Sequence, residues 1–115
     1  MTVNKRIIDA LSPIGIPVTA DFFGDGEEEY ITFNYVTDKG ASYADDEPTA
    51  DVAEMQIHYF LPATKNYLEN KKKIRKALLA AGLTWPDVTV LVEPDQKTRH
   101  LTFECEIENE EELEE

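Results

Sequence analysis

Cysteine and histidine are scarce in this sequence, and their scarcity limits the chemistry open to it. Cys105 is the single cysteine, so the chain can form neither an internal disulfide nor a cysteine-based zinc site. No run of about 18 apolar residues occurs, so we expect no membrane-spanning helix. The start M-T-V-N-K-R-I-I-D-A-L has no long apolar stretch and is typical of a helix rather than a secretion signal. These absences favour a soluble intracellular protein.

Sequence signatures of enzymes are absent as well. The chain has no phosphate loop, no dinucleotide-binding glycine pattern and no nucleophilic serine turn. Asp45-Asp46-Glu47 does not belong to a twelve-residue calcium loop with a central glycine and a final glutamate. Pro94–Lys97 faintly resembles the metal-dependent nucleases, but no second acid followed by a lysine comes after it. We therefore predict no catalytic residue and no cofactor.

The two histidines and the cysteine are better explained as structural residues than as metal ligands or a nucleophile. His58 and His100 are expected on the outer face of two strands, and a metal would need Glu54 or Glu104 to converge on them. Their spacing is not that of metal ligands, so we interpret them as surface residues and predict no metal site. Cys105 alternates in phase with apolar neighbours, which predicts a buried thiol rather than a nucleophile.

Charge is both strongly negative and unevenly placed. The net charge is −13, which argues against naked nucleic acid as a partner, because phosphate binding relies on basic surface. Six of the eleven basic residues lie between Lys65 and Lys76, whereas Glu104–Glu115 holds eight glutamates and no base. One interpretation is a solvated helix face with a solubilising tail. The other is charge-complementary contact between copies of the chain.

A central helix is predicted from Thr64 to Gly82. The Thr64 hydroxyl can cap its start, and Gly82 can end it in a left-handed conformation. An apolar stripe recurs at three- and four-residue steps, so the helix must cover a sheet. The stripe consists of Tyr67, Leu68, Ile74, Ala77, Leu78 and Ala81. The basic residues lie mostly away from it and are candidate interaction residues: Lys71, Lys72, Lys73, Arg75 and Lys76.

The remaining elements follow from alternation, proline and turn residues. A short helix is predicted over Val3–Leu11, with Pro13 stopping it. Alternating or β-branched residues predict the strands Val18–Phe23, Tyr30–Val36, Val52–Leu61, Asp87–Glu93 and His100–Ile107. Pro94–Lys97 predicts a hairpin turn in which Glu93 is the first residue.

Thr37–Asp51 shows no periodicity and is predicted as a long acidic loop. Such a loop is either mobile or ordered by a partner. Tyr43 is its single aromatic residue and is either an anchor for that partner or part of a mobile hairpin tip. Together with Asp45, Asp46 and Glu47 it completes the candidate interaction residues.

The predicted order is α-β-β-β-α-β-β. Hairpin-like links dominate, which indicates an α+β fold with a mainly antiparallel sheet of about five strands and both helices on one face. We expect residues 1–108 to form a single domain and residues 109–115 to form an acidic, disordered tail.

The whole-chain order resembles a family of phage proteins. A short helix leads through Pro17-Val18 to the strand Tyr30–Phe33 and a long polar segment. V-A-E-M-Q-I-H-Y-F, a helix ending in A-L-L-A-A-G-L-T-W and a closing hairpin follow. Over residues 3–108 this is similar to the tail-completion, or tail-terminator, proteins of long-tailed bacteriophages and prophages, and to head–tail joining proteins.

The resemblance implies a non-enzymatic virion protein that forms a ring, typically of six copies, at the head-proximal end of the tail. Its partners would be further copies, the tail tube and the head connector, with no sequence-specific nucleic acid and no membrane. It would be located at the head–tail junction, and in the bacterial cytoplasm during assembly. Thr37–Asp51 would point to the ring interior or to the tube.

Three other functions stay open on the sequence. An acidic protein that imitates DNA would array carboxylates along an elongated surface, although the basic helix speaks against it. A regulatory or adaptor module would bind another protein through its surface. An enzyme is unsupported, because no group of catalytic residues is found.

Overall fold

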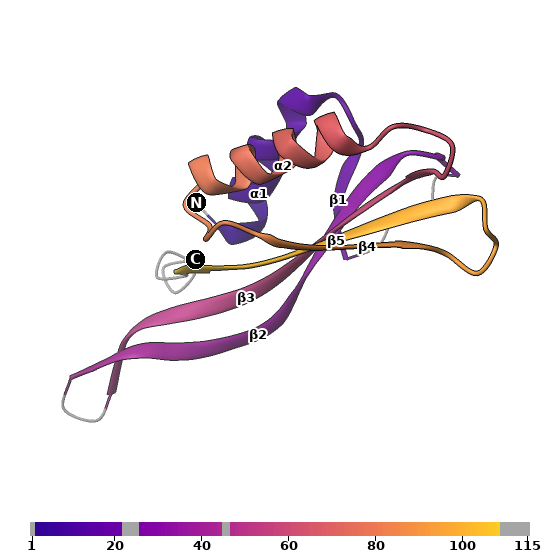
Figure 1. The fold of residues 1–115 in the computed structure, drawn as a ribbon. Helices are drawn as coiled ribbons and strands as arrows, with labels where there is room; N and C mark the ends of the chain where they lie inside the picture. Colours follow the sequence, from indigo (N-terminus) through magenta and orange to yellow (C-terminus); the bar gives the residue numbers. More distant parts are fainter. Residues whose placement is uncertain (1, 22–25, 45–46, 109–115) are drawn as a thin grey trace.

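The computed structural model describes residues 2–21, 26–44 and 47–108, and for residues 38–44 and 47–51 it gives the backbone alone. The described residues form two α-helices, a 3-10 helix and five strands. Both α-helices lie on one side of the sheet, and a ribbon of two strands extends away from them (Figure 1). The elements are α1 (Val3–Leu11), η1 (Ser12–Ile14), β1 (Val18–Ala20), β2 (Tyr30–Ala44), β3 (Glu47–Pro62), α2 (Leu68–Ala80), β4 (Asp87–Val92) and β5 (Thr98–Glu108).

The strands form a sheet in the order β1-β2-β3-β5-β4. The pairs β2–β3, β3–β5 and β4–β5 are antiparallel, as the hairpin-like links predict. β1 instead runs parallel to β2, with Val18 beside Ile31. The predicted α+β class and order of elements are confirmed, and the sheet is mixed rather than wholly antiparallel.

β3 lies in the middle of the sheet and carries the centre of the core. Its inward side chains are at most 1% exposed: Ala53, Met55, Ile57, Tyr59 and Leu61. Val3, Ile7 and Leu11 of α1 and Ile74 and Leu78 of α2 are buried in the same cluster. Burying each large apolar side chain contributes roughly 1.5–3 kcal/mol, which offsets the chain entropy lost on folding.

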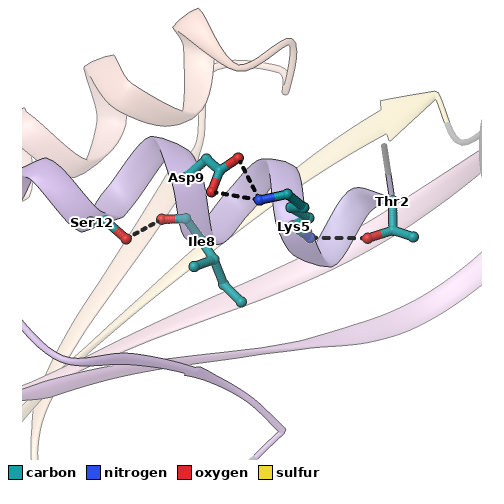
Figure 2. A network of polar contacts seen from close by, with 5 residues as sticks. All are labelled: Thr2, Lys5, Ile8, Asp9 and Ser12. Atoms are coloured by element: carbon teal, nitrogen blue, oxygen red, sulfur yellow. Dashed lines mark hydrogen bonds and ion pairs between the residues drawn. The ribbon is translucent and has the colours of Figure 1, made fainter.

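α1 has the predicted bounds and is fixed by short polar contacts at both ends (Figure 2). The Thr2 hydroxyl accepts from the Lys5 N–H at 3.1 Å, so it satisfies one of the free donors of the first turn. The Lys5 ammonium bonds to Asp9 one turn later at 3.2 Å. At the other end the Ser12 hydroxyl donates to the Ile8 carbonyl at 2.7 Å. Pro13 then lies in η1, which ends the α-helical ladder.

α2 begins later than predicted. It starts at Leu68, after Tyr67, and the Asn66 side chain accepts from the Leu68 N–H at 2.9 Å, so the prediction that Thr64 caps the helix is wrong. Leu68 is 55% exposed and does not belong to the buried stripe, because it occupies the first helical position. The predicted end is confirmed: Gly82 has a φ of 100°, in the left-handed region that glycine adopts without a steric penalty.

The predicted loop over Thr37–Asp51 is wrong, because the backbone continues as a β-ribbon. β2 runs to Ala44 and β3 begins at Glu47, with register shifts after Tyr35, Gly40 and Ser42. Backbone pairing needs no alternation of side chains, and bulges absorb the irregular pattern. The ribbon makes the molecule elongated, with principal extents of 53 × 24 × 22 Å.

The other element ends differ by a few residues. β1 stops at Ala20, since Asp21 has a φ of 70° that leaves the extended conformation. The rest of the predicted Val18–Phe23 strand lies outside the described residues, as does the predicted tail 109–115. The turn after β4 is confirmed: the Gln96 N–H donates to the Glu93 carbonyl at 2.8 Å, which places Pro94 at the second position.

A buried tyrosine of β3 links the sheet to α2 and to the segment just before β2. The Tyr59 side chain is fully buried, and its hydroxyl donates to the Glu29 carboxylate just before β2. Asn70 of α2 donates to the same hydroxyl at 2.8 Å, and Lys65 also binds Glu29. Burial alone would raise the pKa of Glu29, but the bonds from Lys65 and Tyr59 hold it below its ordinary value. Burial, followed by the bond to Glu29, raises the pKa of Tyr59.

We expect Tyr59→Phe to lower the free energy of unfolding by about 1–3 kcal/mol, because Glu29 and Asn70 lose a buried partner. Tyr67→Phe is the matched control, since the ring that stacks on Arg99 at 4.9 Å is retained. Urea unfolding monitored by circular dichroism measures both variants. Equal losses in the two proteins would contradict a role for the Tyr59 hydroxyl.

Candidate assembly surfaces

The basic residues predicted on the helix fall into two groups on α2. Lys72 and Lys76 are exposed. Lys73 pairs with Glu69 at 3.2 Å, and the Lys71 ammonium lies 5.9 Å from the centre of the Tyr67 ring. Such exposed pairs contribute little to stability, so these lysines are held loosely and can be redirected to a partner.

Arg75 is tied into the fold instead. Its Nε donates to the Pro86 carbonyl at 3.1 Å, and its guanidinium stacks 5.4 Å from the centre of the Trp85 ring. The residue therefore attaches α2 to the segment that leads into β4. Its contacts with Pro86 and Trp85 are structural, and contact with a partner stays a prediction.

Two of the four candidate residues of the acidic segment, Tyr43 and Glu47, lie at the far end of the β2–β3 ribbon (Figure 1). Tyr43 pairs with Pro48, and Glu47 pairs with Ala44, both through the backbone. Asp45 and Asp46 lie outside the described residues. The structure therefore does not bring Tyr43 or Glu47 together with the basic residues of α2.

The sheet face opposite the helices carries a second acidic surface that the sequence did not single out. Glu54 pairs in register with Glu106, and Glu104 pairs with Asp87. With Gln56 and Trp85 these four line one groove, which we call the acidic groove. Carboxylates directly opposite one another on neighbouring strands repel, so the Glu104–Asp87 pair lowers stability.

The same face holds a hydrogen-bonded pair of histidines. His58 Nδ1 lies 2.8 Å from His100 Nε2, His58 Nε2 lies 3.1 Å from Asn34 Oδ1, and His100 Nδ1 lies 2.8 Å from Glu93. The outward direction of both histidines is as predicted. Both rings are half-buried and lie within hydrogen-bond distance of each other, a contact that the sequence did not predict.

The hydrogen bonds of Asn34 indicate which ring nitrogen of His58 donates. The Asn34 amide nitrogen donates to the Tyr35 carbonyl at 3.2 Å, so Asn34 presents its oxygen to His58. His58 Nε2 therefore donates to Asn34, which leaves the Nδ1 of a neutral His58 as an acceptor facing His100 Nε2; Thr102 Oγ1 also lies 3.2 Å from that nitrogen.

Aromatic rings flank the histidines. Tyr30 stacks on Phe60 with ring centres 4.9 Å apart, and Phe60 stacks on His100 at 4.2 Å. This row crosses three strands, at the end of the face away from the acidic groove. The face is therefore divided into an aromatic part and an acidic part. Alternation predicted that these side chains share a face, but the register that makes them neighbours is a property of the folded sheet.

Cys105 is 6% exposed and packs in the core, as its phase predicts. Burial, with a smaller effect of Glu106, raises the pKa of its thiol to about 12, which keeps it protonated. Over residues 2–21, 26–44 and 47–108, no three histidine, cysteine or acidic side chains gather as metal ligands. Neither α-helix of the described chain has the length and apolar character needed to cross a membrane.

Comparison with known proteins shows where this fold occurs. Among solved structures, the chain is similar to a chain from the virion of a native gene transfer agent (GTA) particle, with a TM-score of 0.57 and 12% sequence identity. The match covers 94% of this chain and 96% of that chain. No protein-family model matches the sequence, and a search of curated proteins finds no match. At this identity the likeness establishes a shared fold.

We expect stability to fall as pH drops below about 6.5, the ordinary pKa of histidine. Burial, followed by repulsion from His100, lowers the pKa of His58 in the folded state, so the unfolded chain binds this proton more readily. The stabilisation is complete above the unfolded pKa and is lost as pH falls through the folded pKa. Thermal unfolding between pH 7.5 and 5 measures it, above the range where most carboxylates titrate.

His58→Asn supplies the matched variant, because its amide oxygen can still accept from His100 but cannot titrate. The fall in melting temperature over this pH range should become shallower. Parallel curves for the two proteins would show that another group carries the dependence.

Proposed function

We propose that this chain is a non-enzymatic structural protein of a phage or prophage virion. It would form a ring at the head-proximal end of the tail, as a tail terminator (completion) or head–tail joining protein. The observation that carries this proposal is the fold it shares, over nearly the full length of both chains, with a component of a GTA virion. Its partners would be further copies, the tail tube and the head connector, met first in the bacterial cytoplasm.

The distribution of charge supports a ring. A closed ring requires two different surfaces on each copy that fit one another. Lys72 and Lys76 provide a basic surface on the helix side, and the acidic groove lies on the opposite face of the sheet. Placing the lysines of one copy in the groove of the next would neutralise Glu104 and Asp87, which repel one another within a single copy.

The β2–β3 ribbon supports contact with a neighbour beyond the ring. A two-stranded ribbon that leaves the core can bind a neighbouring protein, since its exposed backbone edges can pair with another sheet. Its acidic sequence around Asp45, Asp46 and Glu47 would repel phosphates if it lined a channel, so DNA would pass without sticking. Tyr43 would then be an anchor on the tube.

The ribbon gives the first test. Replacing residues 40–51 by Asn-Gly joins Lys39 to Val52, which are already paired, through a tight hairpin. We expect unchanged thermal unfolding, because the buried core lies outside the ribbon, and loss of completed tails in a prophage that carries only this variant. Electron microscopy of induced lysates counts the tails, and gold-labelled antibody locates the wild-type protein on them.

Wild-type label on the tail end nearest the head supports the proposal. Normal tails from the shortened variant would refute the role of the ribbon. A protein missing from purified particles altogether would refute the structural function and leave the regulatory module or the DNA mimic. Inhibition of a DNA-binding enzyme by the pure protein would then favour the mimic.

The charged surfaces give the second test. Lys72→Glu with Lys76→Glu should lower the yield of complete particles by at least tenfold, since the groove of the next copy then faces acids. Adding Glu104→Lys with Glu106→Lys should restore part of the yield. Lys97→Glu, on the β4–β5 turn, is the control with the same type of charge change. A defect in this control as large as that of the α2 variant would contradict a specific contact.

A further inference from the structure

β4 is an outer strand whose free edge is unusually regular. It pairs with β5 from Asp87 to Val92 without a register shift. Among the described residues, no strand pairs with its other side, since β4 ends the sheet order. Six residues of backbone donors and acceptors therefore alternate between β5 and open space.

After Asp87, the sequence of β4 lacks the usual protection of an edge. Natural edge strands are blunted by lysine, proline, a bulge or short length. Residues 88–92 read V-T-V-L-V, with no charge, proline or glycine. At the other side of the sheet β1 has only three residues, and beyond it β2 is interrupted by a bulge between Tyr35 and Thr37, so β4 is the more regular open edge.

Apolar side chains are exposed along both faces of this edge. Val90, Leu91 and Val92 are 36%, 43% and 43% exposed. Val90 and Val92 share the helix-side face with Val88, and Leu91 lies on the other face with Thr89. The tip of the β4–β5 hairpin extends past the ends of the helices (Figure 1). A strand added here would bury apolar surface on both faces.

We propose that β4 pairs antiparallel with β4 of a second copy of this chain, about a two-fold axis at Val90. The segment V-T-V-L-V reads almost the same in both directions, so it can serve as its own partner. Val90 then faces the second copy's Val90, and Val88 faces its Val92. Thr89 faces its Leu91. The five strands of each copy join into one continuous sheet.

This register follows from the pleat. Side chains keep to their own face only if the axis passes through a residue, because a one-residue slip moves the whole set to the other face. An axis at Thr89 would place Asp87 against Leu91, and an axis at Leu91 would place Thr89 against Glu93. Val90 is the centre that brings valine onto valine.

Charge limits the contact to these five residues. Just outside them Asp87 would meet the second copy's Glu93, and two chains of net charge −13 repel at longer range. Salt screens this repulsion, so the dimer should tighten as ionic strength rises. The ring contact proposed above joins opposite charges and should weaken under the same change. The dimer does not rest on the ring, and the two contacts can be distinguished.

Cysteine cross-linking tests the register. Side chains directly opposite one another in an antiparallel pair have Cβ atoms about 4.5–5.5 Å apart, close to disulfide distance. Val90→Cys should therefore form a disulfide-linked dimer under mild oxidation. Val92→Cys is the matched control with similar exposure, and it should not, because it faces Val88 of the second copy. The natural Cys105 is buried and does not interfere. Equal cross-linking of the two variants would overturn the register.

Light scattering and sedimentation test the dimer itself. The wild-type protein should be dimeric at micromolar concentration in 0.5 M salt, and Val90→Lys should weaken the dimer at least tenfold by placing two ammonium groups face to face. Val36→Lys, on the bulged part of β2, should leave it unchanged. A monomer at all salt concentrations, or a larger ring or open chain indifferent to Val90→Lys, would overturn the proposal.

Discussion

The fold depends on helices covering one face of a sheet and leaving the other face open. β3 shows this division most clearly. Tyr59 and its inward neighbours are buried beneath α1 and α2, while His58 and Glu54 face outward. A core of this size satisfies one face, so the second face and both edges must be stabilised by their own side chains or by other molecules. The polar pair of histidines, the aromatic row and the acidic groove all occupy surface that the helices do not reach.

Sequence patterns predicted the parts of the fold that depend on local periodicity. α1 has its predicted bounds, and the alternation in β3 and β5 correctly separated inward from outward residues, including Cys105. The start of α2 was misplaced, because Thr64 and Asn66 both have polar side chains that can cap, and the choice between them depends on the turn after Pro62. The ribbon was mistaken for a loop, because pairing of its backbone leaves no mark in side-chain alternation.

The candidate surfaces depend more on tertiary placement, which a single sequence does not contain. The basic cluster on α2 could be read directly, yet Arg75 is held by Pro86 and Trp85, which sequence spacing does not reveal. The acidic groove was missed because its carboxylates come from three strands and meet through register alone. The histidines are 42 residues apart in the chain but bonded at 2.8 Å, and the net charge gave no hint of that contact. Long-range register is what the linear pattern does not specify.

The continuity of β3 has a mechanical consequence. From Glu47 near the ribbon tip to Pro62 at the end near the β4–β5 turn it is one strand, paired along one side with β2 and, from Val52 onward, along the other with β5. A pull on the tip along this axis would load many interstrand hydrogen bonds in shear at once, instead of opening them one after another like a zipper. Force applied far from the core would thus travel down a single stiff member to Tyr59 and its anchorage on Glu29 and Asn70. The ribbon would therefore transmit force to the core instead of extending freely.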